Sequence, residues 1–129
     1  MIVVDASVVA TVLADDADDG DRLRSRLRGE RLAAPELIDL EVASVWRRLH
    51  TSGALDERRV RMAFEDLHDL RIERVSHQPL LDRCWALRHN LTIYDAAYVA
   101  LAELLNATLL TGDARLASAP GPECPIEVA

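Results

Sequence analysis

Four acidic residues stand in stretches whose other residues are mostly apolar. Asp5 ends the run "MIVVD", Glu41 lies within "ELIDLEVASV", Asp95 begins "DAAYVALAELL", and Asp113 closely follows "ATLLT". Carboxylates that share one site repel one another, so a cluster of them requires a positive charge nearby. A hard divalent cation such as Mg²⁺ or Mn²⁺ prefers oxygen ligands and suits such a cluster. The first hypothesis is therefore a carboxylate metal site.

Three of these acids also have an ordinary structural interpretation at the start of a helix. Asp5 is a candidate N-cap for "ASVV", and Asp113 for "ARLAS", because an Asp side chain accepts hydrogen bonds from the first free N–H groups of a helix. Thr92 and Asp95 fit the Ser/Thr-x-x-Asp/Glu pattern of a capping box. For any one of these acids taken alone, capping is the simpler interpretation. Glu41 has no such explanation, since it lies inside a predicted helix.

The elements that must position these acids alternate between strand and helix. Short apolar runs predict strands at 2–5, 31–35, 71–75, 107–111 and 125–128. Apolar spacing predicts helices at 6–14, 21–29, 36–52, 56–70, 79–90 and 93–105, with a short helical turn at 113–118. Residues 15–20, "DDADDG", are expected to form an acidic loop. Pro35 stands at the favoured first position of the helix over 36–52, which Gly53 closes.

This alternation defines the fold class. Strands that are continuously apolar and alternate with helices are typical of a sheet covered by helices on both faces. We therefore expect an α/β fold with a mostly parallel sheet of about five short strands. The 129 residues fit one domain, and no repeat or linker divides residues 1–129.

The predicted topology brings the acids to one edge of the sheet. Asp5 and Asp113 follow strands, so they belong at the carboxyl edge, where parallel sheets bind ligands. The helix over 93–105 is expected to run back along the sheet, which places Asp95 at the same edge. Glu41 flanks the apolar stripe near the start of its helix; the stripe itself is predicted to contain Ile38, Val42, Val45 and Leu49. Ser7 and Thr111 supply hydroxyls close to Asp5 and Asp113.

Composition narrows the possible partners and environments. The net charge of −7 argues against binding nucleic acid by bulk attraction, and all fifteen basic residues are arginine. Cys84 and Cys124 are far apart in sequence and are expected to be reduced packing residues. The N-terminal apolar run has no basic flank and is interrupted by Asp5, and no stretch reaches the length of a membrane span. We therefore expect a cytoplasmic protein.

The acidic motifs resemble a known family in both order and spacing. "MIVVDAS", "ELIDLEVASV", "YDAAYVALA" and "LLTGDARL" are similar to the motifs of PIN-domain ribonucleases, and in particular of VapC-type toxins of bacterial type II toxin–antitoxin systems. The resemblance covers the whole chain. It implies that Asp5, Glu41, Asp95 and Asp113 form a catalytic, metal-binding quartet, with Ser7 and Thr111 in supporting roles.

The resemblance also implies an activity and partners. It implies endonucleolytic cleavage of RNA that depends on Mg²⁺ or Mn²⁺, by in-line attack of water on a phosphodiester, leaving a 5′-phosphate and a 3′-hydroxyl. Asp95 or Glu41 would accept the proton of the water. The implied assembly is a homodimer that a cognate VapB-type antitoxin inhibits. Operator DNA would be bound only through the antitoxin.

RNA phosphates must reach an acidic protein, so local arginines matter more than net charge. Most arginines are expected to be solvated or paired with neighbouring acids. Arg115, beside Asp113, is the best candidate for a phosphate contact. The segment "RLRSRLR" would equally suit an antitoxin. The two tryptophans and two tyrosines are expected to lie in the core or at an interface and not to stack on RNA bases. They are Trp46, Trp85, Tyr94 and Tyr98.

Three other functions could in principle use the same acids. A receiver domain also gathers acids around Mg²⁺, but it needs a lysine, and the chain has none. A haloacid-dehalogenase-type phosphatase needs an acid two residues after its nucleophile, where Ser7 stands. The remaining alternative is a catalytically silent metal-binding PIN module that acts as a protein-interaction partner.

Overall fold

The five strands of the computed structural model, which describes residues 1–129, form one sheet in the order β3-β2-β1-β4-β5. Every neighbouring pair runs parallel. The strands are β1 (Ile2–Val4), β2 (Leu32–Pro35), β3 (Ile72–Val75), β4 (Thr108–Thr111) and β5 (Ile126–Val128). The predicted fold class is confirmed, and the sheet is entirely parallel. All five carboxyl ends therefore lie along one edge.

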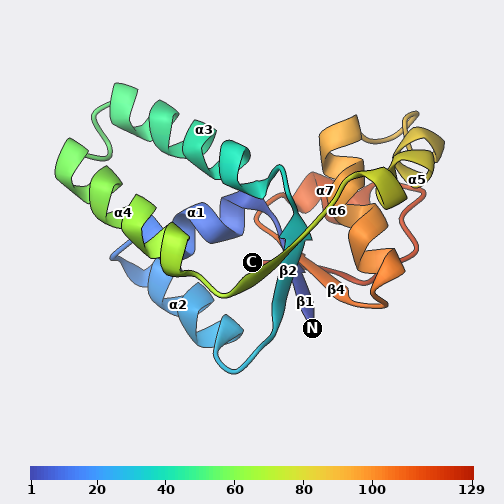
Figure 1. Cartoon of the computed structure of the whole chain (residues 1–129), viewed down its shortest axis with the longest axis horizontal. Helices are drawn as coiled ribbons and strands as arrows, with labels where there is room; N and C mark the ends of the chain where they lie inside the picture. The colour runs from blue at the N-terminus through green and yellow to red at the C-terminus, as the bar shows by residue number, and fades with distance from the viewer.

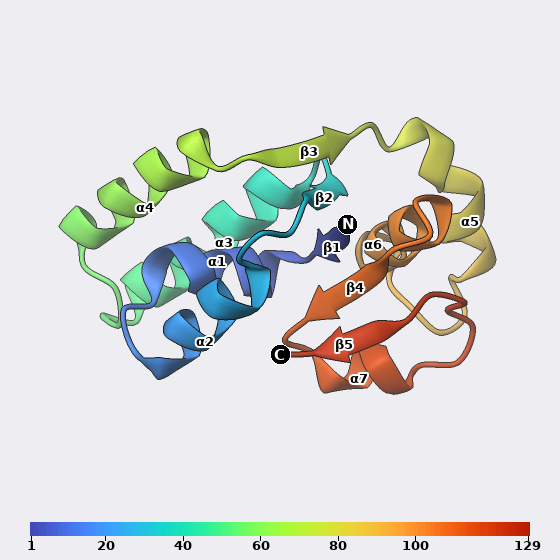
Figure 2. The ribbon, with the colours of Figure 1, turned by 90° about the horizontal axis from the view of Figure 1, so that it is seen from below.

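Helices cover both faces of this sheet (Figures 1 and 2). On one side lie α1 (Ala6–Ala14), α2 (Asp18–Leu27), α3 (Ile38–Thr51) and α4 (Glu57–Asp69). On the other side lie α5 (Leu81–Ala86), preceded by the 3₁₀ turn η1 (Gln78–Leu80), then α6 (Ile93–Leu104) and α7 (Ala114–Ser118). None of these helices is both long enough and apolar enough to cross a membrane.

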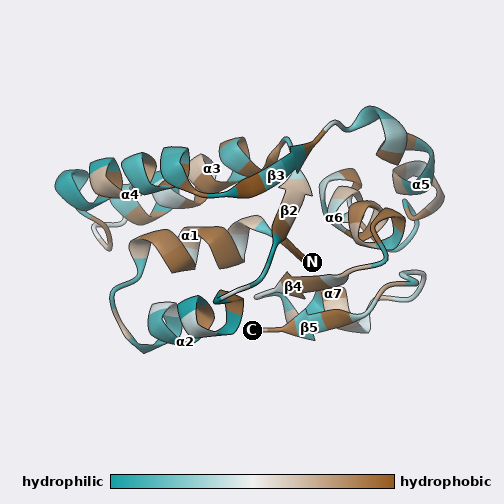
Figure 3. Cartoon of the chain, turned by 60° about the horizontal axis from the view of Figure 1, so that its bottom comes forward, coloured by the Kyte–Doolittle hydropathy of each residue, from teal (hydrophilic) through white to brown (hydrophobic).

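The core lies between the central strands and the two most apolar helices, α1 and α6 (Figure 3). Seven consecutive residues of α6, from Ala96 to Ala102, are buried. A helix buried on nearly all sides needs an apolar residue at nearly every position, and this stretch of the sequence provides that.

The core stripe of α3 differs from the predicted one. The buried residues are Ile38, Val42 and Trp46, whereas Leu49 is 38% exposed. Residues spaced by four lie in one row along a helix, so Trp46 continues the row of Ile38 and Val42. The Trp46 ring packs edge-on against Phe64 of α4 with 4.9 Å between centroids, and its Nε1 donates to the carbonyl of Ala10.

Three predicted boundaries were wrong. Pro35 ends strand β2 instead of opening α3, which begins at Ile38. The helix predicted over 79–90 is the turn η1 followed by the short α5, which ends at Ala86. Helix α2 begins at Asp18, inside the predicted loop.

Gly20 explains the early start of α2. The carboxylate of Asp15 accepts hydrogen bonds from the backbone N–H groups of Ala17 and Gly20, which holds the first turn of the helix. A Cβ at position 20 would lie 2.0 Å from the carbonyl oxygen of Asp15. Only glycine therefore allows this close approach between α2 and the end of α1.

An ion pair fixes α6 against its neighbours. Arg83 of α5 donates through Nε and Nη2 to the Glu103 carboxylate at 2.6 and 3.1 Å, and also to the carbonyl of Gly121. The backbone N–H of Glu123 donates to the same carboxylate. Burial raises the pKa of Glu103, but the bonds from Arg83 and Glu123 outweigh it, and the pKa lies below its ordinary value.

We predict that Glu103→Gln destabilises the protein by about 1–3 kcal/mol at pH 7, because a partly buried Arg83 loses its charged partner. A carboxyl with a lowered pKa stabilises the fold fully above its unfolded pKa and loses this effect as the pH falls through its folded value. The difference in the free energy of unfolding between the parent and the variant should therefore become smaller below about pH 4.3. Urea unfolding at several pH values measures it. Glu65→Gln, at an exposed position of α4, is the control. A difference in unfolding free energy that stayed constant with pH would contradict this account.

Candidate metal centre

Asp5 is held by neutral donors from two neighbouring strand ends. It follows β1 and caps α1, with Oδ1 accepting from the backbone N–H of Val8 at 3.1 Å. The hydroxyl of Ser7 donates to Oδ1 at 2.6 Å, and the buried hydroxyl of Thr111, at the end of β4, donates to Oδ2. The carboxylate is thus oriented on both oxygens without any cation.

The same two hydroxyls also bind the loop after β4. Ser7 Oγ accepts from the backbone N–H of Gly112 at 3.0 Å, and Thr111 Oγ1 accepts from that of Asp113 at 3.0 Å. A Cβ on Gly112 would lie 3.0 Å from Ser7 Oγ, which is tighter than ordinary contact. Ser7 and Thr111 therefore link the ends of β1 and β4.

Glu41 lies half-buried on the first turn of α3 and receives a hydrogen bond from the opposite side of the sheet. The hydroxyl of Tyr98, on α6, donates to Glu41 Oε1 at 2.6 Å. Burial raises the pKa of Glu41; the Tyr98 bond opposes this effect, and the negative charges of Asp95 and Asp5 add to it, so that the net shift is upward. Burial and the bond to Glu41 raise the pKa of Tyr98, which therefore remains a donor.

Asp95 stands in the first turn of α6, as predicted. The hydroxyl of Thr92 caps the helix by accepting from the backbone N–H of Asp95 at 3.1 Å. Burial raises the pKa of Asp95; Thr92 and Arg115 lower it, and the charges of Asp113 and Asp5 raise it further. The balance is a pKa above the ordinary value. The helix N-terminus nevertheless provides a partial positive charge for this carboxylate.

Asp113 caps the short α7, also as predicted. Its Oδ1 accepts from the backbone N–H of Arg115 at 2.9 Å. The Arg115 guanidinium lies 3.4 Å from the same oxygen, and its side chain is 93% exposed. Because both groups are open to water, this pair contributes little to stability, and Arg115 is free to exchange partners.

The structure brings the four predicted acids into one electrostatic cluster. Asp5 and Asp95 both raise the pKa of Glu41, and Asp5 and Asp113 both raise that of Asp95. Of the four, only Asp113 forms an ion pair, the weak one with Arg115. The protein therefore concentrates negative charge at this edge and supplies almost no positive charge to balance it.

The donor set fits a hard divalent cation, because it consists of carboxylates alone. In the structure, however, no group of three or more His, Cys, Asp or Glu side chains is placed so that it could hold a metal ion. Since like charges repel, a cation would have to draw the carboxylates together. The metal-binding and catalytic roles of the quartet stay predictions.

Tyr98 is a site residue that the sequence did not reveal. It was expected in the core or at an interface, and it is indeed only 2% exposed, but its hydroxyl bonds to Glu41. The available signal was its position three residues after Asp95, on the same side of α6. A buried tyrosine hydroxyl needs a partner, and an acid near the same edge was the obvious one.

Most other arginines pair with acids or carbonyls, as expected. The strongest contacts include Arg59 with Asp16 and with the carbonyl of Leu13, and Arg74 with Asp39. Within "RLRSRLR", Arg24 binds Asp21 and Arg26 binds Glu127. Cys84 and Cys124 are free thiols, also as expected.

Comparison with known proteins gives consistent matches. The sequence model of the PIN domain matches residues 2–122. The chain is 44% identical to Ribonuclease VapC1 of Mycobacterium tuberculosis over 127 residues, which cover 98% of this chain and 96% of that protein. It is 41% identical to Ribonuclease VapC9 of the same organism over 128 residues, covering 99% and 98%.

A solved structure shares the fold. The crystal structure of PAE2754 from Pyrobaculum aerophilum superposes with a TM-score of 0.69 at 23% identity, covering 98% of this chain and 83% of that one. At this identity the likeness concerns the fold alone.

We predict that Tyr98→Phe weakens Mn²⁺ binding by about 10- to 100-fold, the usual effect of removing a partner that orients a metal ligand. The reason is that Glu41 loses its donor while remaining half-buried. Calorimetric titration measures the affinity. Tyr94→Phe on the same helix is the matched control, because the Tyr94 side chain is 65% exposed. Equal Mn²⁺ affinities in all three proteins would show that Tyr98 has no part in the site.

Proposed function

The chain belongs to the PIN-domain family, and on that premise we propose that it is a toxin ribonuclease that cleaves RNA by endonucleolytic hydrolysis. The observation that carries the proposal is the uncompensated cluster of Asp5, Glu41, Asp95 and Asp113 at the carboxyl edge of the sheet. The relatives described above are named as ribonucleases, which supports the same activity for this chain.

We propose that Mg²⁺ or Mn²⁺ binds to these four carboxylates. A bound ion of this kind lowers the pKa of a water molecule and offsets the charge that develops on the reacting phosphate. The protein contributes a fixed ligand in Asp5, which Ser7, Thr111 and the backbone of Val8 orient. It contributes a second in Glu41, which Tyr98 holds from the other side of the sheet.

Glu41 or Asp95 would take the proton of the attacking water. In the metal-free protein, burial and neighbouring negative charges raise the pKa of each. Whichever of the two did not coordinate the ion would remain the more basic and serve as the proton acceptor. In-line attack on the phosphodiester would leave a 5′-phosphate and a 3′-hydroxyl. Arg115, exposed beside Asp113, would contact a phosphate of the substrate.

We predict that the protein cleaves single-stranded RNA in Mg²⁺ or Mn²⁺, that EDTA stops the reaction, and that Asp95→Asn lowers the rate by about 10²–10⁴-fold. Cleavage of a labelled RNA, with circular dichroism to verify folding, measures this effect. Asp82→Asn, at an exposed position of α5, is the control.

An Asp95→Asn protein as active as the parent would contradict the assignment. Stabilisation by metal with no cleavage at all would instead support the catalytically silent module.

We further propose a cognate VapB-type antitoxin as the inhibitor and a cytoplasmic location, where the RNA substrate is found. Operator DNA would be bound through the antitoxin and not by this acidic chain. The resemblance to the relatives over nearly their whole length supports these partners.

The proposed homodimer is supported by exposed apolar side chains on α5 and α6. Leu81 is 51% exposed, Trp85 63% and Tyr94 65%, and Leu81 and Tyr94 line one shallow apolar pocket. Arg88 lies over the Trp85 ring at 4.4 Å, which leaves the ring edge free for contact. Large exposed apolar groups of this kind mark interaction surfaces.

We predict a mass in sedimentation equilibrium of twice the 14.3 kDa chain, because a second copy covers these residues. Trp85→Ser should shift the protein toward monomer. Leu104→Ser, at the far end of α6 and 59% exposed in the parent, should not. A parent protein that sediments as a monomer at high concentration would contradict the homodimer.

A further inference from the structure

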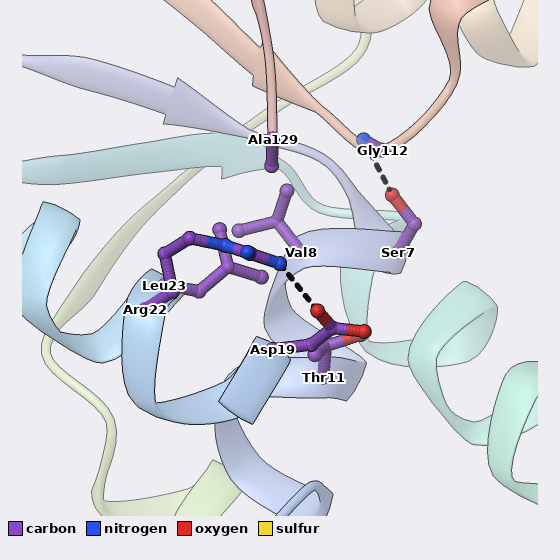
Figure 4. A pocket seen from close by; sticks show the side chains of 8 residues that line it. All are labelled: Ser7, Val8, Thr11, Asp19, Arg22, Leu23, Gly112 and Ala129. Atoms are coloured by element: carbon purple, nitrogen blue, oxygen red, sulfur yellow. Dashed lines mark hydrogen bonds and ion pairs between the residues drawn. The ribbon is translucent and has the colours of Figure 1, made fainter. Parts of the chain in front are cut away.

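A cavity of about 300 Å³ adjoins the acidic cluster (Figure 4). It lies between α1, α2 and the ends of β4 and β5, where the backbone N–H of Ala129 donates to the carbonyl of Thr111. Ser7 and Gly112 form one wall, and Ser7 is hydrogen-bonded to Asp5. The cavity is therefore separated from the proposed reaction site by a single side chain.

The lining of the cavity combines an apolar base with one ion pair. Val8, Leu23 and Ala129 form apolar surface, and Thr11 adds a hydroxyl. Arg22 and Asp19, one turn apart on α2, form an ion pair along the same wall of the cavity (Figure 4). Their side chains are 69% and 71% exposed. Exposed pairs of this kind contribute little to stability, so either group can readily exchange its partner for a ligand.

This combination suits a nucleobase. Proteins read single-stranded RNA by inserting an unstacked base into a pocket, stacking it on an aromatic ring or an arginine guanidinium, and bonding its edge. No aromatic residue lines the cavity, so the base would have to stack on the guanidinium of Arg22. Asp19 is an acceptor for the N–H groups of a base. The volume is at the lower end for ligand sites, which fits one base and excludes a duplex.

We propose that this cavity binds the base of the RNA nucleotide next to the cleaved phosphodiester, and that Arg22 and Asp19 set the base preference at that position. The proposal rests on the ribonuclease function proposed above. The early start of α2 makes it possible, because Asp18–Leu27 as a helix places Asp19 and Arg22 three residues apart on one face. Gly20, which permits that start, is thus required for the cavity as well.

The test is the sequence preference of cleavage on a random-sequence RNA, read by sequencing the product ends. The parent should prefer particular bases at one position flanking the cut. Asp19→Asn, which replaces one of the two acceptor oxygens by an NH₂ donor, should change the preferred base. Thr11→Leu, which fills the cavity without changing its charge, should reduce the preference by about tenfold or more. Arg47→Gln, an exposed arginine on α3, should leave the preference unchanged.

A second measurement does not depend on catalysis. Fluorescence anisotropy in EDTA measures how the parent and the variants bind short single-stranded RNAs that differ at one base. Base-dependent binding that Thr11→Leu removes would support the cavity even if no RNA were cleaved, a result that would reject the ribonuclease function alone.

Two results would overturn the proposal. One is a parent that cleaves, or binds, with a base preference that none of the variants at positions 11, 19 and 22 alters. The other is an Arg22→Gln protein weakened equally toward all bases, since a uniform loss identifies a phosphate contact and not a base contact.

Discussion

Repulsion among carboxylates at the carboxyl edge of a parallel sheet is the constraint on which the rest of this structure depends. Asp5, Glu41, Asp95 and Asp113 come from a strand end, two helix starts and a second strand end. The all-parallel sheet, with α6 returning along it, brings these four positions toward one edge. The apolar strands and the buried middle of α6, Ala96–Ala102, give the acids a rigid base, and this rigidity keeps the like charges close. The fold therefore maintains an arrangement that the charges alone would disrupt.

The protein manages this charge with neutral donors. Hydroxyls of Ser7, Thr111 and Tyr98 orient two of the carboxylates, and helix N-termini stabilise Asp5, Asp95 and Asp113. An arginine in place of any of these donors would cancel the charge and compete with a metal ion. Strong arginine pairs are instead used elsewhere, as between Arg83 and Glu103, where they fix helices in place. This division of roles leaves the acidic edge without a compensating arginine, as the proposed cation site requires.

The sequence predicted the fold class and the positions of the four acids at strand and helix ends because both rest on local patterns. That the four acids form a catalytic metal site stays a prediction. Apolar runs marked all five strands, and capping chemistry correctly placed Asp5, Thr92 and Asp113 at helix starts. It did not predict contacts that depend on tertiary packing. The bond between Tyr98 and Glu41 joins helices on opposite faces of the sheet, and the start of α2 depends on the fit of Gly20 against Asp15. The cavity beside Ser7 follows from that start and could not be derived from spacing alone. Trp46 entered the core row of α3 because Phe64 of a separate helix packs against it.

The central claim is that the four carboxylates bind one divalent metal centre at the sheet edge. Anomalous scattering from a crystal grown with Mn²⁺ tests it most directly. The account predicts a manganese peak within coordination distance of Asp5 and of at least one of Glu41, Asp95 and Asp113, with Tyr98 still bonded to Glu41. Manganese absent from this edge at saturating concentration, or bound only at other surface acids, would contradict it.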